Sequence, residues 1–247
     1  MASLGLFVKD DDPSTLDSVA GARAFVSQYT PLGRVIRRRQ SGKSRACRAF
    51  TLAEGRAVDE HLATFVDTGW LDPESNCDPE YSYLVQTNDR SALAAERIRA
   101  YLVEEGFVAT DSQFQVRYNG VAPILDLVGF DATSGALSIV EIKCGKSAHE
   151  TTGEHAMRPP FQDMVYCGRT TGMLQLAVQF VCMRECISRL KTEAKRPNKL
   201  PRRLCALYPS HSYLLVYTDE HENGDSNYQI QIHRLTDSIV KRVEAVI

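Results

Sequence analysis

The sequence predicts an α/β or α+β fold, in which helices cover one sheet. Two observations support this prediction. Segments with helical periodicity and short runs rich in β-branched residues follow one another in the order helix, helix, strands, helix, strands, helix. The 247 residues, of which 43% are hydrophobic, can build the core of one large domain with an extension. We expect residues 1–48 to form an N-terminal helix and a basic segment, and residues 49–247 to form the core.

Three helices are predicted ahead of the strands. Residues 14–29 have the apolar side of a helix. Residues 51–66 combine an apolar stripe with the pattern of a capping box, in which Thr51 precedes Glu54 by three positions. Residues 89–105 carry a similar stripe and are followed by a glycine, as is common after the last turn of a helix.

Strands dominate the middle of the chain and return near its end. They are predicted over residues 107–118, 123–130, 137–143, 212–218 and 227–235. The link 131–136, DATSGA, is rich in turn residues, so the second and third strands are expected to form a hairpin. Residues 219–226 are predicted to be a turn between the last two strands. Helices are predicted over residues 173–190 and 236–247.

Basic residues gather in two stretches, although the net charge is only −2. The first stretch, residues 34–48, contains Arg34, Arg37, Arg38, Arg39, Lys43, Arg45 and Arg48. The second runs from residue 189 to residue 203. Such clusters can bind phosphate groups, but a solvated loop or helix face explains either one equally well.

The seven cysteines have no regular spacing, and residues 1–12 lack the apolar segment of a secretory signal. We therefore expect free thiols and an intracellular reducing compartment, cytoplasm or nucleus, rather than secretion. Cys182 and Cys186 lie four residues apart on a predicted helix and are interpreted as core residues, because nothing completes a metal-binding quartet. No apolar run approaches the length of a membrane span, so no membrane partner is expected.

The predicted hairpin carries the most informative charges of the sequence. Glu141 and Lys143 are two residues apart in the run SIVEIKCG, so their side chains share one face of the strand. If the link 131–136 is symmetric, Asp126 lies directly opposite Glu141, and two carboxylates oppose each other across the hairpin. The same register pairs Phe130 with Leu137, Val128 with Ile139, Leu127 with Val140 and Leu125 with Ile142. The last two pairs form an apolar face suited to a core.

Opposed carboxylates repel each other unless a positive charge lies near them. A divalent cation such as Mg²⁺ would remove the repulsion between Asp126 and Glu141, and the backbone carbonyl of Ile142 could supply a third oxygen ligand. Lys143 would then lie beside a metal-bound water. The alternative is a solvent-facing hairpin with an ordinary Glu141–Lys143 ion pair. The apolar neighbours in VEIKCG favour the metal site, because charges in such surroundings need a partner.

The segments PILDLVGF and LSIVEIKCG together resemble the PD-(D/E)xK nuclease motif, in the form found in lambda-exonuclease and RecB-type nucleases. The resemblance covers residues 50–245 in the order of elements, although only the hairpin is specific. It implies a restriction-endonuclease-like core with a central mixed β-sheet flanked by helices. It also implies that Asp126, Glu141 and Lys143 are catalytic. Asp126, Glu141 and Ile142 would hold Mg²⁺ or Mn²⁺, and DNA is the expected substrate in preference to RNA.

The chain departs from this family at two helices. The family has a Gly-x-x-x-His pattern before the hairpin, whereas here Gly55 is followed by Asp59. We expect Asp59 to be a further metal ligand, with its neighbour Glu60 as the alternative. After the hairpin the family has a glutamine and, four residues on, a tyrosine, whereas here Gln175 is followed by Gln179. Gln175 is expected to be catalytic by holding the attacking water or a metal-bound water; for Gln179, a bond to the backbone is an equally good interpretation.

Cations ahead of the first core helix contact DNA phosphates in related enzymes. The resemblance assigns this role to Arg37, Arg38, Arg39, Lys43 and Arg45. The run SGKS at residues 41–44 is similar to the end of a phosphate-binding loop, but the earlier glycine and the leading strand are missing. We therefore exclude nucleotide hydrolysis.

These features and the resemblance together predict a Mg²⁺- or Mn²⁺-dependent deoxyribonuclease that hydrolyses phosphodiester bonds. The resemblance to lambda-exonuclease implies exonuclease action as the first choice. The alternatives are a structure-specific endonuclease, a non-catalytic nucleic-acid-binding module on the same fold, and a scaffold protein in which the hairpin is structural. A sequence that lacked one of the motif acids or its lysine would indicate the non-catalytic module, but Asp126, Glu141 and Lys143 are all present. The sequence leaves the oligomeric state open, a homo-oligomer included.

Overall fold

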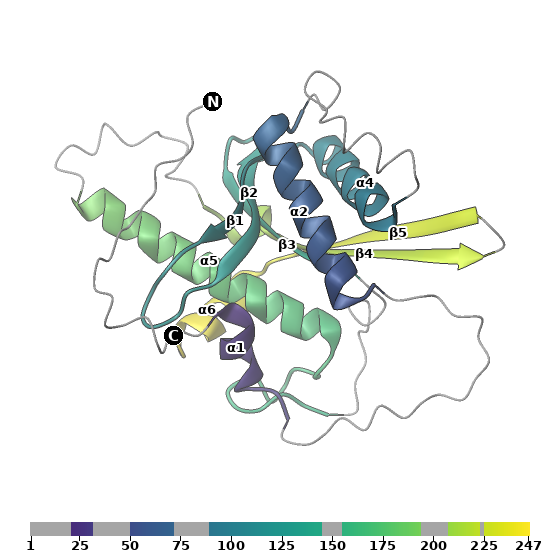
Figure 1. Cartoon of the computed structure of the whole chain (residues 1–247). Coiled ribbons are helices and arrows are strands. Elements are labelled where there is room, and N and C mark those ends of the chain that lie inside the picture. The colour runs from purple at the N-terminus through teal and green to yellow at the C-terminus, as the bar shows by residue number, and fades with distance from the viewer. Residues whose placement is uncertain (1–20, 32–49, 72–88, 145–154, 194–206, 223–224) are drawn as a thin grey trace.

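The computed structural model describes the chain over residues 21–31, 50–71, 89–144, 155–193, 207–222 and 225–247 (Figure 1). Within these residues, helices lie on both faces of one five-stranded mixed sheet. The predicted α/β or α+β class is therefore confirmed. Most of residues 1–48 lies outside the described ranges, so the division of the chain at residue 48 stays a prediction.

The strands follow one another across the sheet in the order β1-β2-β3-β4-β5. They are β1 (Phe107–Gln115), β2 (Ile124–Asp131), β3 (Leu137–Cys144), β4 (Tyr213–Glu222) and β5 (Asp225–Arg234). Neighbouring strands are antiparallel except β3 and β4, which run parallel. Parallel neighbours need a crossover connection, and the chain between β3 and β4 includes the longest of the described helices, α5 (Gly168–Glu193).

Hydrophobic cores form on both faces of the sheet. The other helices are α1 (Ala22–Ser27), α2 (Leu52–Thr68), α4 (Arg90–Glu104) and α6 (Asp237–Glu244). On one face, Leu62 of α2 and Ile98 of α4 belong to the same cluster as Val140 of β3. On the other face, α5 packs with α1 and α6 against side chains such as Ile139 of β3. Figure 1 shows α2 and α4 on one side of the strands and α5, with α1 and α6 beside it, on the other.

The start of α2 has the cap that the sequence predicts. The backbone N–H of Glu54 donates to the Thr51 hydroxyl over 3.1 Å, and the N–H of Thr51 donates to the Glu54 carboxylate over 2.7 Å. These two bonds satisfy N–H groups that have no partner within the helix. At α4, Asp89 caps the first turn by accepting from the N–H groups of Ser91 and Ala92. Both predicted helices are confirmed to within two residues at each end.

The middle of α5 is buried on all sides, which explains why its sequence shows no clear polar face. Residues 172–183 are buried because the sheet covers one side of the helix, and α1 and α6 pack against it as well. Cys182 belongs to this core, and Cys186 packs against it, as the sequence predicts. Gln175 and Gln179 are therefore polar residues inside an otherwise apolar helix segment.

The last hairpin is longer than the sequence predicts. The prediction of a turn over residues 219–226 is wrong, because β4 extends to Glu222, and β5 begins at Asp225. Pairing with the partner strand satisfies the backbone groups of this polar segment, so its composition does not end the strands. Helix α1 covers only Ala22–Ser27 of the predicted 14–29, and residues 14–20 lie outside the described ranges. None of the described helices combines the length and apolar character that a membrane span requires.

We expect Gly129→Ala to disrupt the pairing of β1 with β2. A Cβ at Gly129 would lie 2.1 Å from the carbonyl oxygen of Val108 and 2.8 Å from the Cα of Ala109. The substitution should lower the free energy of unfolding by at least about 2 kcal/mol, because the backbone of β1 must move. Gly55→Ala in α2 is the control, since its Cβ meets nothing within 4 Å, and it should raise stability by about 0.5–1 kcal/mol. Urea denaturation measures both, and an undiminished midpoint for Gly129→Ala would contradict this strand arrangement.

Candidate functional site

The β2–β3 hairpin has the predicted register. Phe130 pairs with Leu137, Val128 with Ile139, and Leu127 with Val140. The ladder ends at the last of these pairs, one position before Asp126 and Glu141. At this point the Asp126 carboxylate accepts a 2.8 Å hydrogen bond from the backbone N–H of Ile142. A side chain of β2 has thus taken the place of its backbone as the partner of β3.

One predicted pair is wrong because the ladder stops here. Leu125 was expected to share an apolar face with Ile142. In the structure, Leu125 belongs to the core on the α5 side, whereas Ile142 belongs to the core under α2 and α4. The strict alternation of faces holds only as long as the two strands remain paired.

Glu141 is a buried carboxylate with two side-chain partners. Only 3% of the residue is exposed. Its Oε1 forms an ion pair with the Lys143 ammonium, and its Oε2 accepts a hydrogen bond from Nε2 of Gln179. Glu141 and Lys143 share one strand face, as predicted. The ion pair of the alternative interpretation is also present, with its carboxylate buried and the Lys143 side chain 35% exposed.

Lys143 stays protonated in these surroundings. Burial by itself would lower the pKa of its ammonium, but the charges of Glu141 and Asp126 together outweigh burial and raise the pKa above its usual value. In this arrangement Lys143 acts as a fixed cation. A proton-accepting role would require the neighbouring acids to be neutralised first.

Asp59 of α2 belongs to the same electrostatic cluster. Burial raises the pKa of Asp59 to about 6, Lys143 opposes this effect, and Glu141 adds to it. Burial also raises the pKa of Asp126 well above its usual range, and the charge of Glu141 raises it further. Glu60, the alternative to Asp59, is exposed. The structure therefore brings Asp59 to the cluster from the helical layer opposite α5.

Gln179 is the glutamine of α5 that contacts the cluster. Its Nε2 donates both to Glu141 and to the backbone carbonyl of Ile124, the latter over 2.9 Å. Because both partners are acceptors, the orientation of the amide is determined, and its buried Oε1 has no partner in the described part of the chain. Gln175, which the resemblance places at the catalytic position, lies one turn earlier and is 9% exposed. The resemblance ranked Gln175 above Gln179, and the sequence could not correct this ranking because the rotation of the helix about its axis is not visible in it.

The oxygen atoms of the cluster suit a hard cation in their chemistry. Over the described residues, however, no group of three or more His, Cys, Asp or Glu side chains is arranged to hold a metal ion. Asp126 and Glu141, with the Ile142 carbonyl, could supply oxygen ligands. Each oxygen of Glu141 already has one partner, so a cation that binds Glu141 would use a remaining lone pair beside Lys143 and Gln179 or displace one of them. Asp59 could then contribute from the facing helix.

The expected phosphate-binding residues Arg37, Arg38, Arg39, Lys43 and Arg45 lie outside the described residues. Their role stays a prediction. Comparisons of the chain with models of protein families, with curated proteins and with solved structures find no match. The proposals below therefore depend on the geometry of the chain and on the resemblance of its hairpin.

We predict that Asp59 makes stability depend on pH. An acid whose pKa is about 6 in the folded state and 3.8 in the unfolded state opposes folding once it ionises. As the pH rises from 4 to 6, ionisation of Asp59 should lower the free energy of unfolding of wild type by about 1–3 kcal/mol. Asp59→Asn should therefore gain stability relative to wild type across that interval, measured by urea denaturation without divalent ions. A difference between the two proteins that stays constant with pH would contradict the placement of Asp59.

We also predict that the two buried glutamines differ in importance. Gln179→Ala leaves the Glu141 carboxylate and the Ile124 carbonyl without their shared donor. It should lower the free energy of unfolding by about 1–3 kcal/mol more than Gln175→Ala, a matched truncation on the same helix. Thermal and urea denaturation provide the measurement. Equal losses in the free energy of unfolding would show that the hydrogen bonds of the Gln179 amide add nothing to its packing.

Proposed function

We propose that the chain is a metal-dependent nuclease of the PD-(D/E)xK class that hydrolyses phosphodiester bonds of DNA. One observation carries the proposal. Asp126, Glu141 and Lys143 come together from two adjacent strands, at a point where the strand ladder has ended. The order of elements, with helices before a three-stranded antiparallel unit and a helix that crosses to a parallel strand, supports a restriction-endonuclease-like core.

Asp126, Glu141 and the Ile142 carbonyl would hold the ion, with Asp59 as a further ligand. Mg²⁺ or Mn²⁺ would supply Lewis-acid chemistry there, which activates water and compensates negative charge on the phosphate. The residues of the chain have separate tasks. Lys143, as a protonated ammonium, stabilises charge that develops on the phosphate oxygens.

Gln179 is the glutamine of α5 that contacts the acids, and the role of Gln175 follows from the resemblance alone. Gln179 holds Glu141 in place through Nε2, and its Oε1 can accept a hydrogen bond from a water beside the acids. Gln175 stays the residue that the family pattern assigns to this water. Cys144 follows the lysine directly, but burial raises the pKa of its thiol, so a cysteine nucleophile is disfavoured.

A non-catalytic nucleic-acid-binding module is the second candidate. It is favoured by the ion pair that occupies Glu141 and by the missing three-ligand group among the described residues. The nuclease is preferred because both acids and the lysine are retained together in the interior. Burial of charge opposes folding, so a sequence that keeps these three groups together favours a chemical use for them.

We predict metal-dependent cleavage of DNA by the purified chain. End-labelled linear DNA and nicked circular DNA, incubated with Mn²⁺, Mg²⁺ or EDTA, separate exonuclease from endonuclease action. Cleavage should require the divalent ion, and Glu141→Gln and Lys143→Ala should each reduce its rate at least about 100-fold, because each removes a charge next to the reacting phosphate.

Glu60→Gln is the control for this experiment, since Glu60 adjoins Asp59 on α2 but is exposed. Its rate should stay close to that of wild type. Wild type that binds DNA equally well in Mn²⁺ and in EDTA, and never cleaves it, would favour the binding module instead.

A further inference from the structure

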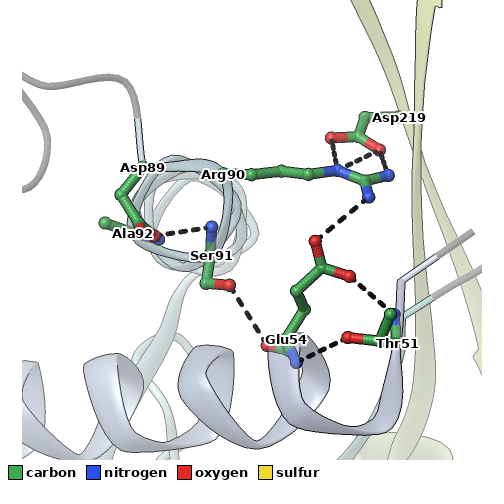
Figure 2. A network of polar contacts seen from close by, with 7 residues as sticks. All are labelled: Thr51, Glu54, Asp89, Arg90, Ser91, Ala92 and Asp219. Atoms are coloured by element: carbon green, nitrogen blue, oxygen red, sulfur yellow. Dashed lines mark hydrogen bonds and ion pairs between the residues drawn. The ribbon is translucent and has the colours of Figure 1, made fainter. Parts of the chain in front are cut away.

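A second polar network lies outside the acidic cluster and joins α2, α4 and β4 (Figure 2). Arg90, the first residue of α4, reaches Asp219 of β4, which is 129 positions away in the chain. Its Nε donates to Oδ2 over 2.9 Å and to Oδ1 over 3.2 Å, and its Nη2 donates to Oδ1 as well. The guanidinium also lies 4.0 Å from the centre of the Phe50 ring. Such a forked, stacked arrangement is specific to arginine.

The same network includes the first turn of α2. Glu54 uses Oε2 to accept from the N–H of Thr51, while its Oε1 lies 3.6 Å from Nη1 of Arg90. The hydroxyl of Ser91 donates to the backbone carbonyl of Glu54 over 3.3 Å. Figure 2 shows Glu54 rising from the start of α2 toward the guanidinium, with Asp219 on the far side. The beginning of α2 is therefore tied to α4 and, through Arg90, to β4.

The ion pair of this network is buried, so the cost of removing its charges from water keeps its net effect on stability small. The side chain of Asp219 is 3% exposed and that of Arg90 is 16% exposed. Removing such groups from water offsets most of the attraction between them. What a buried, forked ion pair adds is a defined geometry between the elements that carry it.

The elements at the two ends of the network are those that support the acidic cluster. Asp59 follows Glu54 by five residues on the same helix. Strand β4 is the parallel neighbour of β3, where Lys143 lies opposite Val216, and Cys144 lies opposite Tyr217. Asp219 is two residues beyond that pairing. The network thus connects the helix that carries Asp59 to the strand beside Glu141 and Lys143.

We propose that Arg90 is a positioning residue, which holds α2 against β4 so that the Asp59 carboxylate remains with Asp126 and Glu141. The inference rests on the proposed function, because it assigns Asp59 a part in binding the divalent ion. Arg90 itself touches neither the acids nor the substrate. Displacement of a site group by about 1 Å through a distant substitution can reduce turnover about 100-fold.

Two substitutions test this role. Arg90→Lys keeps the charge but loses the fork, and Asp219→Asn keeps the shape but loses the charge. Asp163→Asn is the control for the loss of a forked ion pair elsewhere in the chain, because Asp163, which is exposed, forms such a pair with Arg242 of α6. Three quantities are measured on the folded full-length chain: the dissociation constant of Mn²⁺ by electron paramagnetic resonance, kcat and KM for DNA cleavage, and amide hydrogen exchange.

Both Arg90→Lys and Asp219→Asn should weaken Mn²⁺ binding about tenfold. They should lower kcat by about 10- to 100-fold while KM changes by less than about threefold. Amides of residues 54–59 should exchange faster, and amides of α5 should not. The control should leave Mn²⁺ binding and kcat unchanged.

Variants that lose thermal stability but retain Mn²⁺ affinity and kcat would overturn the positioning role and leave the proposed nuclease intact. Wild type that neither binds Mn²⁺ nor cleaves DNA would overturn the nuclease, and this inference with it. If one variant fails to fold, the other still decides, since the two act on opposite ends of the same ion pair.

Discussion

The arrangement depends on one electrostatic constraint, which is that the carboxylates of Asp126 on β2 and Glu141 on β3 lie near enough to interact where the ladder between the two strands ends. Burial raises the pKa of Asp126, and repulsion by Glu141 raises it further. Three neighbouring groups donate to these carboxylates and offset their negative charge. The ammonium of Lys143 and the amide of Gln179 contact Glu141, and the N–H of Ile142 bonds to Asp126.

The surroundings of the cluster come from both faces of the sheet. Helix α5 contributes Gln179 from a segment that is otherwise apolar and buried, so its amide has few alternative partners. Helix α2 contributes Asp59 from the opposite face, with a first turn that is capped by Glu54 and tied through Arg90 to Asp219. Burial of these charges opposes folding, and the two apolar cores offset this cost, because burial of apolar surface stabilises the fold by about 25 cal/mol per Å². The proposed divalent-ion site therefore combines acids that repel one another with neighbouring elements that hold them in place.

Local sequence patterns predicted much of this structure. The capping box of Thr51 and Glu54 identified the start of α2, because it depends only on residues three apart. The turn residues of the link 131–136 and the apolar alternation predicted the register of β2 and β3, down to the pairing of Leu127 with Val140. The predictions were wrong where pairing overrides composition. Leu125 lies in the opposite core because the ladder has stopped, and the polar residues after Asp219 continue as strands because they pair with each other.

The sequence by itself determined that Glu141 and Lys143 share one face of a strand and that Asp126 lies near them, since strand alternation and a short link are local properties. Only the tertiary structure decided which glutamine of α5 contacts Glu141, because the rotation of a helix about its axis depends on the surfaces that pack against it. It likewise decided that Asp59 approaches from α2, and that Arg90 meets Asp219. Partners separated by 129 residues are brought together by the packing of whole layers, and no spacing in the sequence encodes that distance.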